Sequence, residues 1–111
     1  RSTDGGKSFQ PWQKMGFQGH PFHALKLNDG RVLLTYGYRH EPYGIRAKIL
    51  NPECTDISRA PEFIIRDDGG TRDLGYPWST QLDDDRVLVV YYFNKDDGTR
   101  HIAGSVLRIT K

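Results

Sequence analysis

Residues 27–36, LNDGRVLLTY, return later in the chain as residues 82–91, LDDDRVLVVY. The short segment before them returns too, since residues 19–22 read GHPF and residues 75–78 read GYPW. The two copies are offset by 55 to 56 residues. A repeat of about this length, built from short strands and turns, is typical of β-propeller blades. Because repeat folds usually need about three units for stability, we expect either a fragment of a larger ring or an assembly of several copies.

Strand signals dominate both copies, and no stretch shows sustained helical periodicity. In each copy an acidic turn joins two runs rich in Val, Leu and Tyr, which predicts a hairpin. A third strand follows in each copy and a fourth in the first copy, so the expected strands are 22–27, 31–38, 44–50 and 62–66, then 78–82, 86–93 and 100–109. We also expect residues 8–14 to form the fourth strand of a preceding unit, paired with a third strand such as 100–109, either of the same chain or of another chain.

This order predicts an all-β chain with about two four-stranded antiparallel propeller blades. Residues 1–18 are the expected end of a preceding blade, and residues 19–70 the first full blade. Residues 71–111 are the expected second blade, which lacks its outer strand.

The composition excludes several classes of protein. The net charge is only +2 and the basic residues are scattered among acidic ones, so we expect no nucleic-acid partner. The longest apolar run, residues 87–93, is far too short to span a membrane, and we expect no membrane partner. The single cysteine, Cys54, excludes an intrachain disulfide.

Residues 2–9, STDGGKSF, fit the pattern Ser-x-Asp-x-Gly-x-Ser/Thr-Trp/Phe. This motif resembles the Asp-box of sialidases and related propellers. Its Ser and Asp side chains can bond the backbone amides of a tight hairpin, and its glycines allow a positive φ. We interpret this motif as a structural element that stabilises a hairpin rather than as a ligand-binding or catalytic site. The equivalent stretch of the next unit, residues 51–57, keeps only a degenerate trace of it.

Four further segments, residues 37–39, 42–47, 73–77 and 90–94, resemble the sialidase-like (BNR-repeat) proteins near their C-terminal end. The resemblance covers almost the whole chain. It implies part of a six-bladed propeller, a carbohydrate or anionic sugar as ligand, no cofactor, and a secreted or periplasmic location, although the sequence alone leaves the compartment unknown. It also implies an exo-sialidase-like glycoside hydrolase, but only where the full site is assembled.

The resemblance assigns the catalytic roles to Tyr76 and Asp73. A tyrosine nucleophile is an exception among glycosidases, which otherwise use two carboxylates. Tyr76 begins an expected inner strand, but Pro77 follows it where a Ser is usual. The alternative is that Tyr76 packs between blades like His20, and that Asp73 caps a turn.

The resemblance also assigns carboxylate binding to Arg39 and Arg46, because the planar guanidinium makes two parallel bonds to a carboxylate. The two arginines flank the expected loop between the second and third strands. The alternative is that each is a surface arginine paired with an acidic neighbour. No residues have the spacing of a metal site, since His20 and His23 would point to opposite faces of a strand.

The sequence therefore supports two hypotheses for the function of this chain. One is a sialidase-like, glycan-recognising segment that is incomplete as an enzyme on its own. The other is a non-catalytic carbohydrate-binding or oligomeric scaffold module. The expected partners are accordingly an anionic sugar, and either further copies of the chain or the remainder of a larger propeller.

Overall fold

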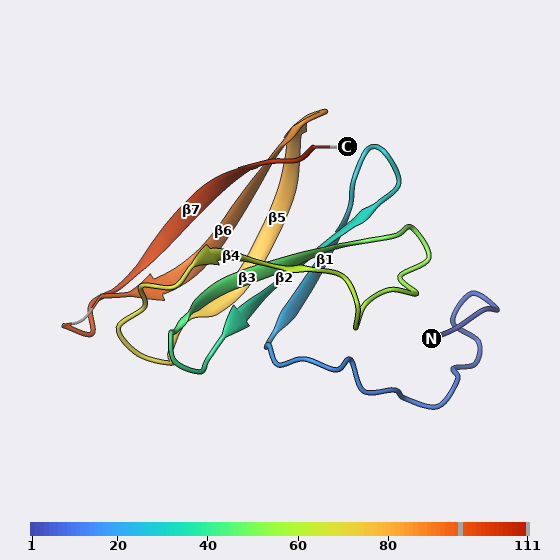
Figure 1. Ribbon diagram of the computed structural model, residues 1–111, viewed down its shortest axis with the longest axis horizontal. Coiled ribbons are helices and arrows are strands. Elements are labelled where there is room, and N and C mark those ends of the chain that lie inside the picture. The colour runs from blue at the N-terminus through green and yellow to red at the C-terminus, as the bar shows by residue number, and fades with distance from the viewer. Residues whose placement is uncertain (96, 111) are drawn as a thin grey trace.

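A computed structural model describes residues 1–95 and 97–110. These residues form two antiparallel sheets and no helix (Figure 1). The first sheet has the order β1-β2-β3-β4 and the second the order β5-β6-β7. Their strands are β1 (Phe22–Lys26), β2 (Val32–Tyr38), β3 (Gly44–Leu50), β4 (Glu62–Arg66), β5 (Gly75–Asp83), β6 (Arg86–Asn94) and β7 (Arg100–Arg108). The all-β prediction is confirmed, and so are seven of the eight expected strands, to within a few residues at their ends.

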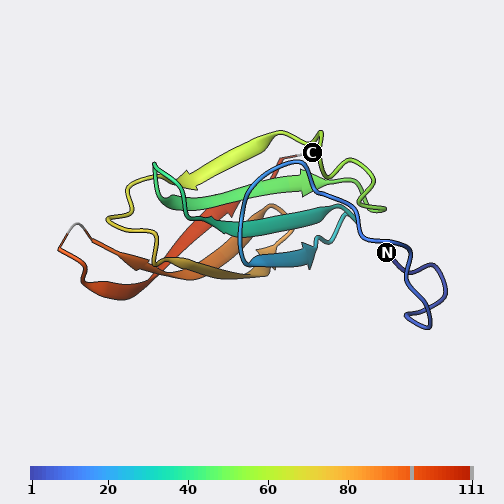
Figure 2. The same ribbon diagram turned by 90° about the horizontal axis from the view of Figure 1, so that it is seen from below.

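The two sheets pack face to face as two layers (Figure 2). Alternate residues of β6 point toward the first sheet, and Val87, Val89 and Phe93 are almost completely buried. From the first sheet, Leu33 and Ile45 enter the same apolar core. This alternation follows from the two-residue period of a strand, which sends one set of side chains to the core.

The repeat is visible in the contacts between the sheets. The Nδ1 atom of His23 lies 3.1 Å from the Oγ of Ser79, its counterpart 56 residues later. The side-chain amide of Asn28 donates to Asp84, again 56 residues later, over 3.3 Å. The first strands of the two units, β1 and β5, thus lie side by side although they belong to different sheets.

The other face of the first sheet carries a second apolar cluster, built on Leu34, Tyr36, Leu50 and Ala60. Side chains from the N-terminal segment and from the β3–β4 loop pack on it, among them Phe17, whose ring centroid lies 5.2 Å from that of Tyr36. The first sheet is therefore covered on both faces.

Residues 8–14 form no strand, so the expected pairing with a third strand of the same chain was wrong, while pairing with another chain stays a prediction. A strand needs a partner edge, and this segment lies away from both sheets (Figure 1). Phe9 and Trp12 are 72% and 81% exposed.

The loop before that segment is ordered by the expected bonds. The Ser2 hydroxyl accepts from the Gly6 amide over 2.9 Å, and the Asp4 carboxylate accepts from the Ser8 amide over 2.9 Å. Asp4 also accepts from the Ser8 hydroxyl. In the degenerate counterpart, the side chain of Asn51 accepts from the Thr55 amide over 3.0 Å, so a different residue serves the same turn.

Candidate functional site

Five polar and aromatic residues converge where several strands begin or end. Arg39 follows β2, Asp73 and Tyr76 lie at the entry to β5, Tyr92 lies near the end of β6, and Arg100 begins β7. We call these five residues the Tyr76 cluster. The fold therefore brings three of the four residues singled out from the sequence, Arg39, Asp73 and Tyr76, to one place.

The backbone of Tyr76 lies in the left-handed region, with a φ of 48°. A bulky side chain rarely adopts this conformation, and it costs about 1–3 kcal/mol. Tyr76 lies in an irregularity of the β5–β6 pairing between Gly75 and Trp78. The preceding residue approaches β2 closely, since a Cβ added to Gly37 would lie 3.1 Å from the Cα of Gly75. The Tyr76 side chain nevertheless stays 63% exposed. A strained residue that presents its side chain to solvent is typical of a functional position.

The carboxylate of Asp73 is bound by Tyr92 and Arg100 rather than by Tyr76. The Tyr92 hydroxyl donates to Oδ1 over 2.7 Å, and the Nε of Arg100 donates to Oδ2 over 2.5 Å. These two bonds lower the pKa of Asp73 below its ordinary value. Burial and the bond to Asp73 raise the pKa of Tyr92, so Tyr92 stays protonated near neutral pH.

Arg39 joins Tyr76 to this network. Its Nε donates to the Leu74 carbonyl over 3.1 Å, and its Nη2 lies 3.4 Å from the Tyr92 hydroxyl. Its guanidinium carbon lies 5.5 Å from the centre of the Tyr76 ring. Among the described residues Arg39 forms no ion pair, although its charge contributes to the lowered pKa of Asp73. A cation next to an exposed tyrosine is suited to binding a planar anion such as a carboxylate.

Arg46 lies elsewhere. It stands opposite Tyr36 in the β2–β3 pair, on the face of the first sheet turned away from the second sheet. Its Nη1 pairs with the Glu62 carboxylate over 2.6 Å, and its guanidinium lies 3.5 Å from the centre of the Tyr38 ring. The structure therefore does not bring Arg46 together with Tyr76, as a shared clamp on one ligand would require.

Asn94 is a supporting residue that the sequence analysis missed. It is 1% exposed, and its side-chain amide donates to the carbonyl of Asp73 over 2.7 Å. Its side-chain oxygen accepts from the amide of Thr71 over 2.7 Å. These bonds fix the loop that leads into Tyr76. The only signal in the sequence is a polar residue that ends an apolar strand.

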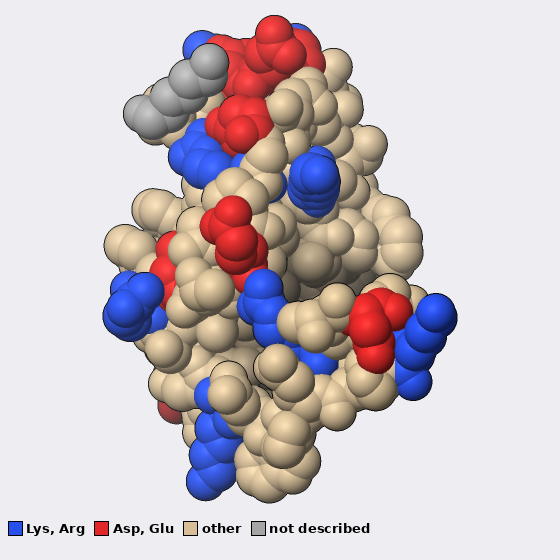
Figure 3. Space-filling model, turned by 90° about the vertical axis from the view of Figure 1, so that its right-hand side faces the viewer, with Lys and Arg blue, Asp and Glu red and all other residues tan. Residues whose placement is uncertain are grey.

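The remaining titratable groups suggest no other chemistry. No group of three or more His, Cys, Asp or Glu side chains is arranged to hold a metal ion within residues 1–95 and 97–110. On the side of the molecule shown in Figure 3, basic and acidic side chains are interspersed. No helix in the described part of the chain is long and apolar enough to cross a membrane.

Comparison with known proteins finds a longer relative. A crystal structure of a protein of unknown function from Dyadobacter fermentans is similar to this chain, with 68% sequence identity and a TM-score of 0.96 over 98% of the chain. The chain spans 30% of the length of that relative. No family model matches the chain. No curated protein matches it either.

Proposed function

We propose that this chain is a segment of a sialidase-like, Asp-box β-propeller and that the Tyr76 cluster recognises an anionic sugar. The observation that carries the proposal is Tyr76 itself, an exposed tyrosine held in a strained conformation beside Arg39, which has no ion-pair partner among the described residues. A sialic acid or a related carboxylate-bearing sugar is the ligand class that this pair fits, because the ring can contact the sugar while the guanidinium binds the carboxylate.

Three features support the propeller. Two repeat units form separate antiparallel sheets that stack face to face, as neighbouring blades do. Their first strands lie side by side, which is the arrangement of inner strands around an axis. The Asp-box loop has the side-chain to backbone bonds expected of the motif.

In the sialidase-like mechanism a tyrosine attacks the anomeric carbon and a carboxylate activates it. In this chain Asp73 is paired with Tyr92 and Arg100, so Tyr76 lacks a carboxylate bonded to its hydroxyl among the described residues. The first arginine and the acid/base aspartate of the sialidase-like site belong to blades outside the resemblance. We therefore propose that the isolated chain binds the sugar weakly and does not hydrolyse a sialoside.

The alternative, a non-catalytic binding or scaffold module, draws on the outer face of the second sheet. Trp78 is 67% exposed and Ile102 is 77% exposed on that face. An apolar surface of this kind is typical of association with another sheet.

Titration with N-acetylneuraminic acid, followed by NMR, tests the proposal, with a neutral hexose as the ligand control. We expect shifts at Arg39 and Tyr76 for the acid and none for the neutral sugar. Arg39→Lys should weaken binding about tenfold, because a point ammonium cannot replace the two-pronged contact. Tyr76→Phe should largely spare it.

Arg46→Lys is the matched control, since the same substitution on the opposite face should leave binding unchanged. Loss of binding in Arg46→Lys but not in Arg39→Lys would contradict the assignment of the site. Rapid hydrolysis of a sialoside by the wild-type chain would contradict the statement that it is incomplete as an enzyme.

A further inference from the structure

We propose that Tyr92 is the positioning residue of the Tyr76 cluster, and that its hydroxyl holds the Arg39 guanidinium in the orientation that binds the carboxylate of the sugar. Tyr92 acts through Arg39 and does not itself contact the ligand. The inference rests on the proposed function for the identity of the ligand, and it adds the residue that sets the geometry of the site. The orientation of Arg39 can be measured without any sugar.

The hydroxyl of Tyr92 connects Arg39 to Asp73, and chemistry fixes the direction of both hydrogen bonds. The hydroxyl donates its proton to Oδ1 of Asp73 over 2.7 Å. Hydrogen bonds from Tyr92 and Arg100 lower the pKa of Asp73, so its carboxylate is ionised near neutral pH and can only accept. A guanidinium can only donate. The contact of 3.4 Å between Nη2 of Arg39 and the hydroxyl is therefore a bond from Arg39 to Tyr92.

These bonds also decide which edge of the guanidinium stays available. Nε of Arg39 donates to the carbonyl of Leu74 over 3.1 Å, and Nη2 donates to Tyr92. The guanidinium carries five N–H groups in one rigid plane. Among the described residues Nη1 has no hydrogen-bond partner, and Nη2 keeps a second proton. Nη1 and Nη2 can therefore still bind the two oxygens of a carboxylate in parallel.

The ring of Tyr92 supports the other half of the site. Its centroid lies 5.7 Å from that of the Tyr76 ring, with an angle of 30° between the two planes. Tyr92 lies on β6 in regular pairing with β7, opposite Ile102, whereas Tyr76 lies in an irregularity of the β5–β6 pairing. A regular strand holds a side chain more precisely than a loop does. One side chain on β6 thus contacts both the guanidinium and the exposed ring.

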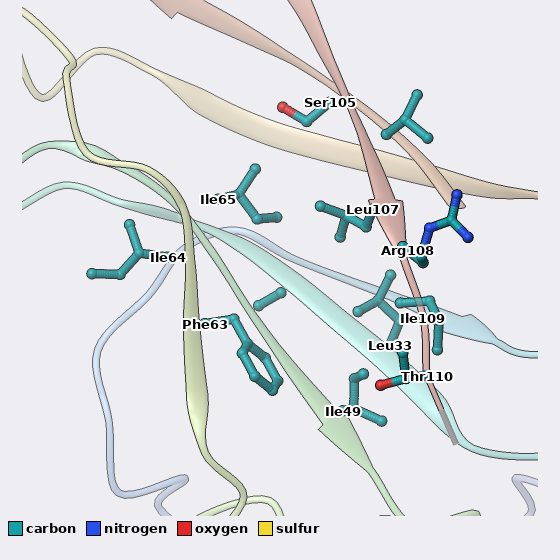
Figure 4. Close-up of a pocket in the computed structure, with 12 residues that line it drawn as sticks. Leu33, Ile49, Phe63, Ile64, Ile65, Ser105, Leu107, Arg108, Ile109 and Thr110 are labelled. Carbon is teal, nitrogen blue, oxygen red and sulfur yellow. The ribbon is translucent and has the colours of Figure 1, made fainter. Parts of the chain in front are cut away.

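Tyr91, the preceding residue, provides a matched comparison on the opposite face of β6. Its hydroxyl lies 2.7 Å from the hydroxyl of Ser105. Ser105 lines an apolar groove of about 450 Å³ between β4 and β7 (Figure 4). No residue of the Tyr76 cluster lines this groove. Tyr91→Phe therefore removes a hydroxyl and its hydrogen bond from the same strand without touching Arg39.

Rotation of the Arg39 guanidinium about its Nε–Cζ bond, measured by NMR without ligand, tests the positioning. Tyr92→Phe keeps the ring and its contact with Tyr76 but removes the acceptor for Nη2. We expect the rotation to become about three- to tenfold faster, the effect of losing one hydrogen bond. Tyr91→Phe should rotate like the wild type. Equal rotation in Tyr92→Phe and the wild type would overturn the proposal.

Titration with N-acetylneuraminic acid tests the consequence for binding. Tyr92→Phe should weaken binding by about three- to tenfold, and Tyr91→Phe should leave it unchanged. Because Tyr92 acts through Arg39, adding Tyr92→Phe to Arg39→Lys should cause little further loss. Full additivity of the two losses would contradict this route.

The two experiments separate the positioning from the choice of ligand. A wild-type chain that does not bind the acid would contradict the proposed function. If rotation of Arg39 were still faster in Tyr92→Phe alone, the positioning of Arg39 by Tyr92 would stand. Sugar binding with unchanged rotation and unchanged affinity in Tyr92→Phe would leave the proposed function intact and overturn the role of Tyr92.

Discussion

At the scale of single residues, the backbone at Tyr76 and the carboxylate of Asp4 both depart from ordinary values. Tyr76 has a φ of 48°, which bulky residues avoid, yet its side chain contributes little burial. Asp4 accepts hydrogen bonds from the hydroxyl and the amide of Ser8, and these bonds lower its pKa to about 2. The strained backbone of Tyr76 points to a functional role, whereas the lowered pKa of Asp4 reflects hydrogen bonds that order the N-terminal loop.

Tyr76→Gly should leave the free energy of unfolding nearly unchanged or raise it, because glycine adopts a positive φ without strain. The large buried aromatic Phe93, which is 1% exposed, provides the contrast. Phe93→Ala should cost about 3–5 kcal/mol. Urea denaturation compares the two variants. A cost at Tyr76 as large as that at Phe93 would show that the ring is structural.

Asp4 should titrate with a pKa of about 2, well below its ordinary 3.8. Because the folded pKa is lowered, the contribution of the carboxylate is fully present above pH 3.8 and is lost as the pH falls through 2. The amide shift of Ser8, followed by NMR against pH, checks this value. Asp4→Ala should remove the titration and speed exchange at that amide, whereas Lys7→Ala should do neither. A midpoint near 3.8 would mean that the loop is not formed.

At the scale of elements, the loop between β4 and β5 depends on one buried side chain. Asn94 bonds both the Thr71 amide and the Asp73 carbonyl, and so it connects the end of β6 to the entry of β5. The loop in turn carries Asp73 and leads into Tyr76. Its order therefore rests on β6 rather than on the residues of the loop alone.

Asn94→Ala should lower the free energy of unfolding by about 1–3 kcal/mol, because it removes the hydrogen bonds that this buried side chain makes to the amide of Thr71 and the carbonyl of Asp73. It should also weaken sugar binding although Asn94 does not contact the proposed ligand. Asn51→Ala, which removes a side-chain bond from another loop, serves as the control and should spare binding. Wild-type binding in Asn94→Ala would show that the loop is positioned by other contacts.

At the scale of the whole molecule, the two faces of the second sheet differ in what covers them. The inner face, with Val87 and Val89, is buried against the first sheet. The outer face, with Trp78, Ile102 and Val106, is exposed. In the repeat, this outer face of the second sheet is the counterpart of the face of the first sheet that packs against the second sheet.

A single substitution placed on each face tests this difference. Val89→Thr should cost about 1–3 kcal/mol of stability, because it buries a hydroxyl among apolar side chains. Val106→Thr should change stability by less than about 0.5 kcal/mol, since the side chain is 58% exposed. Thermal melting of the two variants provides the measurement. Equal losses would mean that both faces are covered in solution.

Local sequence patterns were sufficient to predict seven of the strands, the hairpin turns and the repeat. These depend on alternation and turn chemistry within a few residues, as in the hairpin that joins β1 and β2. The Asp-box bonds were predictable for the same reason, because donor and acceptor lie within four residues of each other. The alternation of Ile45, Arg46 and Ala47 also carried a signal that Arg46 faces away from its apolar neighbours.

The packing of the two sheets sets which residues meet at the Tyr76 cluster, and no local pattern predicted it. Asp73 bonds Tyr92 and Arg100, which lie 19 and 27 residues away, rather than the nearby Tyr76. The strained backbone of Tyr76 lies in an irregularity of the β5–β6 pairing between Gly75 and Trp78, where Gly75 also approaches Gly37 of β2. Residues 8–14 form no strand although their local pattern predicts one, because a strand also needs an edge to pair with. Such contacts depend on how the sheets pack, which no local pattern encodes.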